Sequence, residues 1–364
     1  MNYRYVVVGA GLAGLTVAER IANVLGEKVL VIEKRSHIGG NVYDSHNEDG
    51  ILIHNYGPHI FHTNDREVYR YLGQFTPWND FWHRVLTYVD GNLIPMPITV
   101  ETINALYNLN LSCDQIEDFL KQQAVPVEAI KTSKDVALSK VGEDIYRKIF
   151  ETYTKKQWGL DPAELDTSVI SRIPIRLNRD TRYFNDKYQG MPKYGYTKMC
   201  ENMITNKNIK VLLNTDYKEV ISDITYEKMI YTGPTDYFYD YKHGQLAYRS
   251  IDFVFETYDH EEYQSAPVVN YPNDYDYTRI TEFKKMTAQE HKKTTILKEY
   301  PCSDGEPYYP FPTKEYKAQF SLYESEMEKE DKVLFLGRLA EYRYYNMDAV
   351  VRRALDIFKG GLNG

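Results

Sequence analysis

Apolar and polar positions divide the first part of the chain into three short elements. Residues 5–8 form an unbroken apolar run rich in β-branched side chains, which is typical of a strand buried on both faces of a parallel sheet. Apolar positions then recur at helical spacing over residues 12–22, and residues 28–33 form a second strand-like run that ends at Glu33. This order predicts a strand, a helix and a second, parallel strand.

The middle of the chain changes to a helical pattern. Residues 101–160 contain few β-branched runs, and apolar positions lie four apart between residues 145 and 153, on one predicted helix face. Ser112 and Gln115 have the spacing of a capping box, which predicts that a helix opens there. We therefore expect a helical insertion.

Strand patterns occur on both sides of this insertion. Residues 84–98 alternate around Asp90 and Gly91, a dipeptide typical of a hairpin turn. Residues 245–300 contain repeated strand-like pieces, which predict an antiparallel sheet. Residues 331–361 predict a strand, a glycine turn and a closing helix that returns to the N-terminal sheet.

The order of these patterns predicts an α/β fold in which a Rossmann-like dinucleotide-binding domain, a helical insertion and an antiparallel sheet domain are interleaved. The predicted ranges are 1–77 with about 195–240 and 330–364 for the dinucleotide domain, about 101–170 for the insertion, and about 78–100, 179–194 and 245–329 for the sheet domain.

Composition and charge limit the function. The 364 residues are 43% hydrophobic and 26% charged, without an apolar run of the roughly 18–20 residues that cross a bilayer, so we expect no membrane insertion. The first residues lead directly into a strand without a signal-peptide cleavage site, and Cys113, Cys200 and Cys302 are too far apart for a disulfide framework, so we expect a cytoplasmic protein. The net charge of −8 argues against binding to nucleic acid, but permits a local pocket of arginines for a small anion.

Glycines follow the first strand in a dinucleotide-binding pattern. Gly9, Gly11 and Gly14 have GxGxxG spacing, which permits a tight turn, close approach of a pyrophosphate to the backbone, and packing of helix on strand. The helix N-terminus then offers N–H groups to the phosphates, and Glu33 is placed to accept hydrogen bonds from a ribose.

The residues after Glu33 favour FAD over NAD. Arg35, Gly39 and Gly40 form an RxxxGG extension that resembles the FAD-binding motif of amine oxidases and of flavoproteins similar to GDP-dissociation inhibitors. Two glycines after a strand can also form a simple turn, but their spacing from Glu33 favours the cofactor interpretation.

Several later strings occur together: GPHIFHT, YTKKQWG, RIPIR, YFNDKYQGMPKYGYTKM, YTGPTDYF, YTRITE, KEYP, PYYP and GRLAEYRYYNMD. In this order they resemble the UDP-galactopyranose mutase family, bacterial flavoenzymes that interconvert UDP-galactopyranose and UDP-galactofuranose. The resemblance implies a nucleotide-sugar substrate, reduced FAD and a homodimer. It also implies that flavin N5 attacks the anomeric carbon, the diphosphate leaves, and a flavin–sugar iminium lets the ring open and close again without net redox change.

The resemblance also implies roles for individual residues. Arg172, on a loop expected to be mobile near residues 165–178, and the fixed Arg279 bind the diphosphate, because guanidinium groups suit phosphate oxygens. With His59, expected near flavin N5, they form the predicted catalytic set. The predicted substrate-binding residues are Phe150, Tyr153, Trp158, Arg172, Tyr183, Asn270, Arg279, Glu299, Tyr309, Tyr344, His83 and Asn346. The predicted cofactor-binding residues are Gly9, Gly11, Gly14, Glu33, Lys34, Arg35, Gly39, Gly40, Asn41, Tyr56, Gly57, His59, Ile60, Arg338, Tyr344, Asn346 and Met347.

Five of the nine histidines lie within residues 37–65. Their spacing fits no paired set of metal ligands, so we expect no metal. The resemblance instead implies a wall around the flavin, with Gly57 and His59 near the isoalloxazine. His37 and His46 are expected to be solvated loop residues.

Two positions depart from the family pattern. Asn346 stands where family members have Asp, and His83 stands where they have Asn near the sugar. Both changes alter hydrogen bonding close to the hexose, so the choice of sugar stays open. UDP-galactopyranose is the expected substrate, and UDP-N-acetylgalactosamine or a 6-deoxy sugar such as dTDP-fucopyranose is the alternative. A flavin oxidoreductase and a non-enzymatic binding protein similar to GDP-dissociation inhibitors are the other classes considered.

Overall fold

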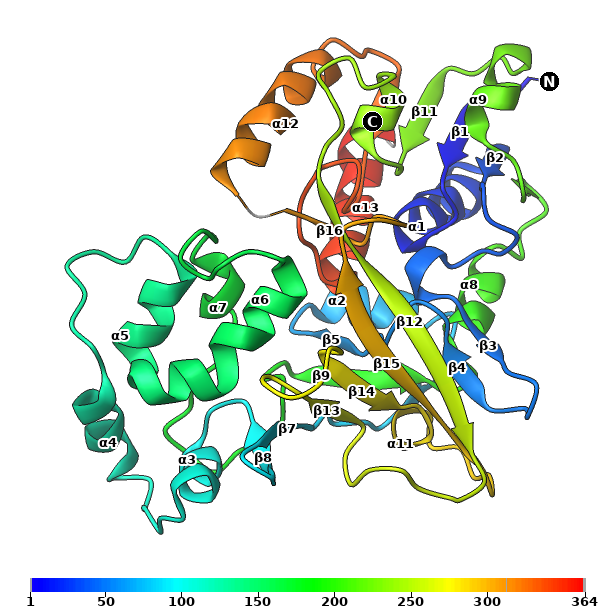
Figure 1. The fold of residues 1–364 in the computed structure, drawn as a ribbon. Helices are drawn as coiled ribbons and strands as arrows, with labels where there is room; N and C mark the ends of the chain where they lie inside the picture. The colour runs from blue at the N-terminus through cyan, green and yellow to red at the C-terminus, as the bar shows by residue number, and fades with distance from the viewer. Residues whose placement is uncertain (1, 312, 363–364) are drawn as a thin grey trace.

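A parallel sheet of five strands is the centre of one half of the molecule (Figure 1). The computed structural model describes residues 2–311 and 313–362. All side chains of the first two strands of the chain are buried, as their unbroken apolar runs predict. The strand order is β10 (Ile209–Leu212), β2 (Val29–Ile32), β1 (Tyr5–Val8), β11 (Lys228–Tyr231) and β17 (Val333–Phe335), with every pair parallel.

The two faces of this sheet bury different layers. Val7 belongs to the core that includes α1 and α13, whereas Val6 and Val8 pack on the other face with Tyr217 and Phe335. The last helix lies against the first, which confirms the predicted return of residues 331–361. The helices of this half are α1 (Leu12–Arg20), α2 (Arg66–Leu72), α8 (Tyr196–Met203), α9 (Tyr217–Val220), α10 (Thr235–Phe238), α12 (Lys314–Met327) and α13 (Met347–Ile357).

A second sheet of seven strands occupies the other half. Its order is β16 (Tyr309–Pro310), β12 (Tyr248–Tyr258), β15 (Thr294–Cys302), β14 (Arg279–Glu282), β13 (Val268–Asn270), β7 (Val85–Val89) and β8 (Asn92–Met96). The predicted hairpin at Asp90 joins β7 to β8. The expectation of a purely antiparallel sheet is wrong at one place, because β7 pairs in parallel with β13. The whole helical insertion lies between these two strands, and such a long connection permits parallel pairing.

The helical insertion packs beside this sheet, at the left of Figure 1. Its apolar residues, which include Ile103, Ile116, Val136 and Ile145, share one core with residues of β7, β8 and β13. The helices are α3 (Val100–Tyr107), α4 (Ile116–Gln123), α5 (Ser133–Ile145), a π-helical segment (Tyr146–Glu151), α6 (Thr152–Trp158) and α7 (Ser168–Ser171); α11 (Lys284–Thr287) follows β14 instead.

One local prediction in the insertion needs correction. The helix predicted to open at Ser112 begins at Ile116, because residues 113–115 form a turn in which the Gln115 N–H donates to the Ser112 carbonyl. One contact of the predicted capping box is nevertheless present, since the Ser112 N–H donates to the Gln115 side chain at 2.9 Å. Residues 146–151 form a π-helical turn, but Ile145 and Ile149 are both buried in the same core.

Two smaller sheets connect the halves. β3 (Asp44–His46) pairs with β4 (Leu52–His54), and β9 (Tyr188–Pro192) pairs with both β5 (Phe61–Thr63) and β6 (Trp78–Asn79). β6 and β9 were predicted within the antiparallel sheet domain, but they do not join its seven strands. The predicted domain boundaries themselves stay a prediction.

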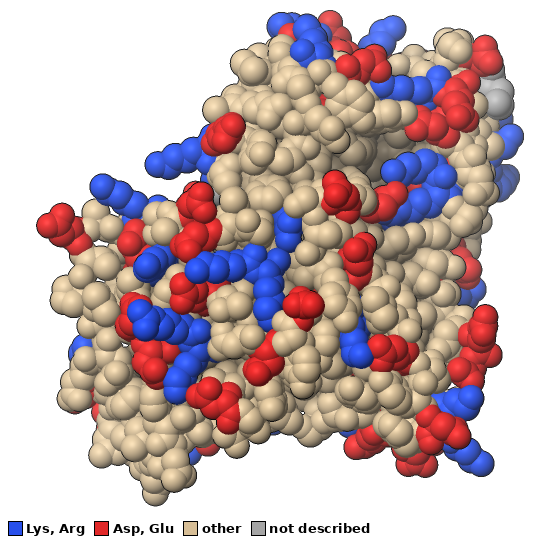
Figure 2. Space-filling view, viewed as in Figure 1, with Lys and Arg blue, Asp and Glu red and all other residues tan. Residues whose placement is uncertain are grey.

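No helix in residues 2–311 and 313–362 combines the length and apolar character that spanning a membrane requires. On the face shown in Figure 2, basic and acidic side chains are interspersed over the helical insertion. A positive pocket on this chain therefore has to come from a few arginines that converge locally.

Replacement of Gly14 by alanine should destabilise the first half of the fold. A Cβ at this buried position of α1 would lie 2.1 Å from the Gly9 carbonyl oxygen and 2.9 Å from Val7 Cγ1. We expect Gly14→Ala to lower the free energy of unfolding by about 1–3 kcal/mol, measured by urea denaturation. Gly360→Ala is the control, because its Cβ meets open space. Equal midpoints for Gly14→Ala and the unmodified protein would contradict this packing.

Candidate active site

A glycine loop joins β1 to α1 and lines a cradle of backbone atoms. Gly9 has a φ of 101°, which favours glycine. Gly11 is the N-cap of α1 and has no side chain with which to cap the first N–H groups, so these groups can receive an anion. Gly40 comes so close that a Cβ on it would lie 2.9 Å from the Gly11 Cα. The cradle has the chemistry that a pyrophosphate requires.

Glu33 lies beside this cradle and is 6% exposed. One of its carboxylate oxygens accepts from the Ala10 N–H at 2.7 Å and the other accepts from the Arg35 N–H at 2.8 Å. Each oxygen can accept a second hydrogen bond, so a ribose hydroxyl can still be bound. The predicted ribose contact stays a prediction.

Arg35 organises the other polar residues near the cradle. Its guanidinium lies 4.3 Å from the centre of the Tyr56 ring and donates to Asn41 at 3.1 Å and to Glu306 at 2.9 Å. Lys34 lies 3.5 Å from the same Glu306 carboxylate. Four residues predicted to bind the cofactor therefore lie next to one another.

His37 also belongs to this group, so the prediction that it is a solvated loop residue is wrong. Its ring stacks on Tyr43 with 3.7 Å between centroids, and its Nε2 lies 2.7 Å from the Tyr56 hydroxyl. Tyr43 and Tyr56, which come later in the chain, contact the His37 ring. The residues next to His37 in sequence could not indicate these contacts. His46, in contrast, is exposed on β3, as predicted.

His54 and His59 form a pair next to Gly57. The backbone N–H of His59 donates to Nδ1 of His54 at 3.1 Å. The Nδ1 of His59 lies 2.8 Å from the Gly57 carbonyl and must carry the proton, because a carbonyl can only accept. Burial lowers the pKa of both histidines to about 3, so both rings are neutral at pH 7. The Nε2 of His59 is consequently a hydrogen-bond acceptor.

A row of side chains crosses the seven-stranded sheet toward Gly57. Asn270, Arg279 and Glu299 are direct cross-strand partners on β13, β14 and β15, and Phe253 on β12 is the next partner. Partners directly opposite each other point to the same face. Arg279 Nε donates to Glu299 at 2.6 Å, and Phe253 lies 3.3 Å from where a Cβ on Gly57 would be. The row therefore connects the sheet to the loop that carries His59.

Arginines and tyrosines gather beside this row. The rings of Tyr309 and Tyr344 stack at 5.6 Å, the Arg172 guanidinium lies 4.8 Å from the Tyr344 ring, and Arg338 lies within 5.3 Å of both rings. Desolvation would raise the pKa of the Tyr344 phenol, but the charges of Arg172 and Arg338 lower this pKa. The cluster is strongly cationic, as an anion-binding site has to be.

Three further predicted residues belong to the same cluster. Burial raises the pKa of Tyr153 to about 12 and also raises that of Tyr183, while the charge of Arg279 acts on both phenols in the opposite direction. The Trp158 ring lies 6.4 Å from the Tyr309 ring. The structure thus brings together most of the predicted substrate-binding residues.

Some predicted residues have packing roles in the structure. Phe150 is 4% exposed within the core of the insertion, and Ile60 and Met347 pack against the main core. Their predicted contacts with substrate or cofactor stay predictions.

The two residues that depart from the family pattern have different surroundings. His83 is 4% exposed, its ring lies 5.6 Å from that of Tyr183, and its Nδ1 has no hydrogen-bond partner within the described residues. Asn346 is the N-cap of α13, although its side chain makes no capping bond. An unpaired buried nitrogen is a place where a substrate hydroxyl can bind.

Sequence reasoning missed several residues around the site. Phe253 was part of a recognised strand, but alternation does not reveal which neighbour a residue meets. Glu306 lies in a loop without a pattern. His62 stacks on Phe184 at 3.6 Å and its Nδ1 lies 2.6 Å from Asp186, a long-range pair that only the fold brings together.

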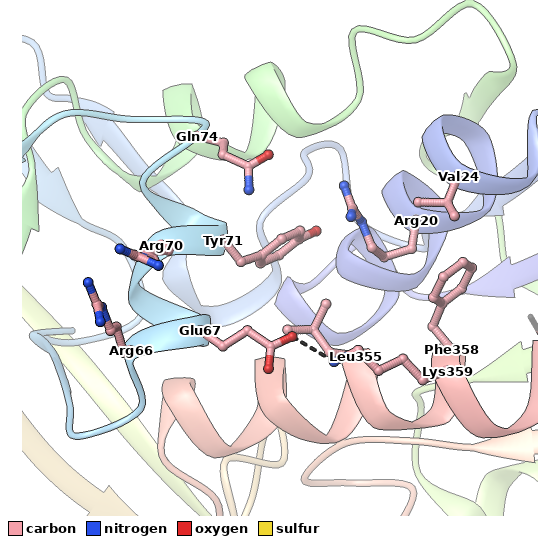
Figure 3. A pocket seen from close by; sticks show the side chains of 10 residues that line it. All are labelled: Arg20, Val24, Arg66, Glu67, Arg70, Tyr71, Gln74, Leu355, Phe358 and Lys359. Carbon is pink, nitrogen blue, oxygen red and sulfur yellow. Dashed lines mark hydrogen bonds and ion pairs between the residues drawn. The ribbon is translucent and has the colours of Figure 1, made fainter.

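A separate hollow lies between α1, α2 and α13 (Figure 3). Two of its cations are already paired, Arg20 with Glu19 at 2.5 Å and Lys359 with Glu67 at 2.6 Å. None of the predicted site residues lines it, so we assign it no role in the reaction. Within the described part of the chain, no group of three or more His, Cys, Asp or Glu side chains is arranged to hold a metal ion.

Known proteins share these features. A family model of UDP-galactopyranose mutase matches residues 148–344, and a model of an NAD(P)-binding Rossmann-like domain matches residues 7–75. The chain is 38% identical to a probable UDP-galactopyranose mutase of Klebsiella pneumoniae, over 97% of this chain and 93% of that protein. The chain belongs to the UDP-galactopyranose mutase family. The resemblance seen in the sequence motifs is thereby confirmed, and the protein is a mutase, an enzyme of the isomerase class.

Relatives within the family differ in their named substrates. The chain is 35% identical to dTDP-fucopyranose mutase of Escherichia coli, over 97% of each protein. It is 32% identical to UDP-galactopyranose mutase of Mycoplasma genitalium, over 96% of this chain and 92% of that one.

Solved structures confirm the predicted fold class. A crystal structure of reduced UDP-galactopyranose mutase matches with a TM-score of 0.80 and 18% identity, over 98% of this chain and 96% of that one. A putative protoporphyrinogen oxidase from Exiguobacterium matches with a TM-score of 0.70 and 12% identity, over 98% of each. At these identities the matches show the fold alone.

The buried histidines should make the stability of the protein depend on pH. Burial holds the pKa of His54 and His83 at about 3, against 6.5 for an ordinary histidine. Below pH 6.5 the unfolded chain takes up protons that the folded chain does not, so the stability present above pH 6.5 is lost as the pH falls toward 3. Each buried histidine should contribute a fall of about 1.4 kcal/mol per pH unit well below pH 6.5.

Urea denaturation of the purified protein between pH 7.5 and pH 5 measures this fall. His83→Asn should make the fall shallower by one histidine's share, whereas His46→Asn, at an exposed position, should leave it unchanged. The same pH dependence in His83→Asn and in the unmodified protein would show that His83 is not held neutral.

Proposed function

We propose that this protein is an FAD-dependent mutase that interconverts the pyranose and furanose forms of a nucleotide sugar, with UDP-galactopyranose and UDP-galactofuranose as the first choice. The proposal is carried by the sheet row of Asn270, Arg279 and Glu299, which joins the arginine–tyrosine cluster to Gly57. The arginine–tyrosine cluster, which suits a diphosphate, lies at one end of this row. Gly57 and His59, which are predicted to line the flavin, lie at the other end. A sugar attached to a diphosphate would lie between them.

The residues present fit FAD. The Gly11 and Gly40 cradle at the start of α1 would hold the pyrophosphate, and Glu33 would bind a ribose hydroxyl. Gly57 and His59 would lie along the isoalloxazine. Reduced FAD, when bound, supplies the nucleophile for the anomeric carbon. His59 is neutral, so its Nε2 would accept a hydrogen bond from the ring system without adding a charge.

The arginines would bind the diphosphate as substrate handle and as leaving group. Glu299 occupies the Nε of Arg279, so the two terminal nitrogens of this guanidinium remain for phosphate oxygens. Arg172 would contribute a second guanidinium group that binds phosphate oxygens. Burial raises the pKa of Tyr183 and of Tyr309, which keeps both phenols protonated as hydrogen-bond donors. A released diphosphate would thus stay in place until the ring closes again.

The identity of the sugar is the finer part of the proposal. His83 has an unpaired buried Nδ1, and Asn346 presents an amide where the family pattern has an acid. A 35% identical relative is named dTDP-fucopyranose mutase, which supports a 6-deoxy sugar as the alternative. UDP-N-acetylgalactosamine is a further alternative, and we expect the enzyme to act as a homodimer.

Assays of the holoenzyme with and without dithionite test the proposed function. The panel contains UDP-galactopyranose, UDP-galactofuranose, UDP-N-acetylgalactosamine and dTDP-fucopyranose, and chromatography separates pyranose from furanose. We expect a yellow protein that interconverts at least one pair, and only after reduction. Absence of conversion for the whole panel, together with steady oxygen consumption on another substrate, would favour a flavin oxidase instead. Absence of bound flavin and of any turnover would favour a binding protein.

Loss of either predicted diphosphate arginine should nearly abolish turnover. We expect Arg172→Ala and Arg279→Ala each to reduce kcat/KM by about 100-fold or more, because each removes charge-assisted hydrogen bonds worth roughly 1.5–3 kcal/mol apiece. The flavin absorbance per protein should stay unchanged, since neither residue lines the cofactor cradle. Arg147→Ala is the control, because Arg147 is exposed and pairs with Glu143 on the insertion. Activity of either variant within a few-fold of the unmodified enzyme would remove that arginine from the site.

A further inference from the structure

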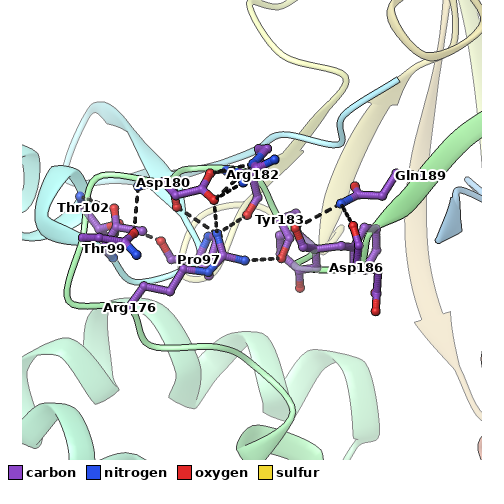
Figure 4. A network of polar contacts seen from close by, with 11 residues as sticks. Pro97, Thr99, Thr102, Arg176, Asp180, Arg182, Tyr183, Asp186 and Gln189 are labelled. Atoms are coloured by element: carbon purple, nitrogen blue, oxygen red, sulfur yellow. Dashed lines mark hydrogen bonds and ion pairs between the residues drawn. The ribbon is translucent and has the colours of Figure 1, made fainter. Parts of the chain in front are cut away.

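Arg176 is a buried arginine that the predicted chemistry does not use. It follows Arg172 by four residues, and its side chain is only 6% exposed. Figure 4 shows it at the centre of a network of polar contacts between the end of the insertion and the loop before β9. Burying a guanidinium is unfavourable unless its donors are satisfied, so this arrangement calls for an explanation.

The guanidinium of Arg176 binds the backbone of a single turn. Its Nη1 donates to the carbonyl of Asp180 at 2.8 Å and to the carbonyl of Arg182, and its Nη2 donates to the carbonyl of Tyr183 at 3.2 Å. The Asp180 carboxylate is 4.0 Å away and is occupied by Arg182 at 2.7 Å. The two terminal nitrogens of Arg176 therefore bind carbonyls at three positions, whereas its buried Nε has no hydrogen-bond partner within the described residues.

The backbone around Arg176 is anchored to a different part of the fold. Its N–H donates to the Ile98 carbonyl at 2.9 Å, and Ile175 forms a parallel bridge with Ile98. Two residues later, the Asn178 carbonyl accepts from the Val100 N–H at 3.1 Å, at the start of α3. The end of the loop predicted to be mobile near residues 165–178 is thus fixed at Ile175 and Arg176.

Tyr183 is held from both sides of its peptide backbone. Its N–H donates to the His83 carbonyl at 2.7 Å, while its own carbonyl accepts from Arg176. These two backbone contacts fix the direction in which the Tyr183 side chain points. The phenol lies near enough to Arg172 and Arg279 for both charges to act on its pKa.

We propose that Arg176 is a positioning residue. It holds Tyr183 and the end of the segment that carries Arg172 in the relative positions that diphosphate binding requires. The proposal rests on the proposed function, in which Arg172 and Tyr183 bind the diphosphate. Arg176 acts through backbone contacts and does not touch substrate. It lies between residues 165–174, which belong to the loop predicted to be mobile, and the turn of residues 178–183, which its hydrogen bonds hold.

Kinetics of Arg176 variants test this inference on the reduced holoenzyme. We expect Arg176→Gln to reduce kcat/KM about 10- to 100-fold and to weaken binding of UDP, with flavin content unchanged. Arg176→Lys keeps the charge without the planar fork and should recover part of the loss. Arg179→Gln is the matched control, because Arg179 lies on the same turn but is exposed and pairs with Glu101. It should stay within about two-fold of the unmodified enzyme.

Combination with Tyr183→Phe distinguishes positioning from a general loss of stability. If Arg176 acts through Tyr183, the double variant should lose less than the product of the two single losses. Losses that multiply, or an Arg176→Gln enzyme with unchanged kcat/KM and UDP affinity, would overturn the inference. If Arg176→Gln does not fold, the same double-mutant comparison with Tyr183→Phe is made with Arg176→Lys, and its result supports or overturns the inference in the same way. An unmodified enzyme without turnover would refute the proposed function, whereas an active enzyme insensitive to Arg176 would refute only this inference.

Discussion

The buried pair of Arg279 and Glu299 is the interaction on which the candidate site depends. Glu299 is fully buried, and an ionised carboxylate in the interior is stable only when a cation and hydrogen bonds compensate it. Arg279, on the neighbouring strand, provides the cation and one hydrogen bond, while the second Glu299 oxygen has no partner within the described residues. Because the two residues are direct cross-strand partners, the register of β14 and β15 fixes the place of the cation. The site is therefore charged and oriented before any ligand arrives.

The long strands of the second sheet connect this ion pair to the loop that carries Gly57 and His59. β12 and β15 run from the sheet toward the Rossmann-like half in Figure 1, and Phe253 on β12 meets Gly57. The sheet thus contacts the Gly57 loop through Phe253 and the helical insertion through β7 and β8. Groups that have to meet within a fraction of an ångström are best carried by such regular elements, since loops alone hold positions less exactly.

The sequence predicted the parts of this arrangement whose signals are local. The βαβ unit over residues 5–33 and the hairpin at Asp90 each have their pattern within a few neighbouring positions. Parallel pairing of β7 with β13, the contact of His37 with Tyr56 and the contact of Phe253 with Gly57 depend on partners farther away in sequence. No local pattern encodes such partners. The roles of the site arginines came from motif resemblance, and they stay predictions that the geometry supports.

The parallel pairing of β7 with β13 also matters while the protein is being synthesised. The entire insertion and much of the Rossmann-like half leave the ribosome between these two strands. At translation rates of about 5–20 residues per second, the β7–β8 hairpin waits on the order of ten seconds or more for its partner. During that time one edge of an apolar strand has unpaired backbone groups, a form prone to aggregation. Until β13 has been synthesised, this edge of β7 is therefore open to pairing with the wrong strand.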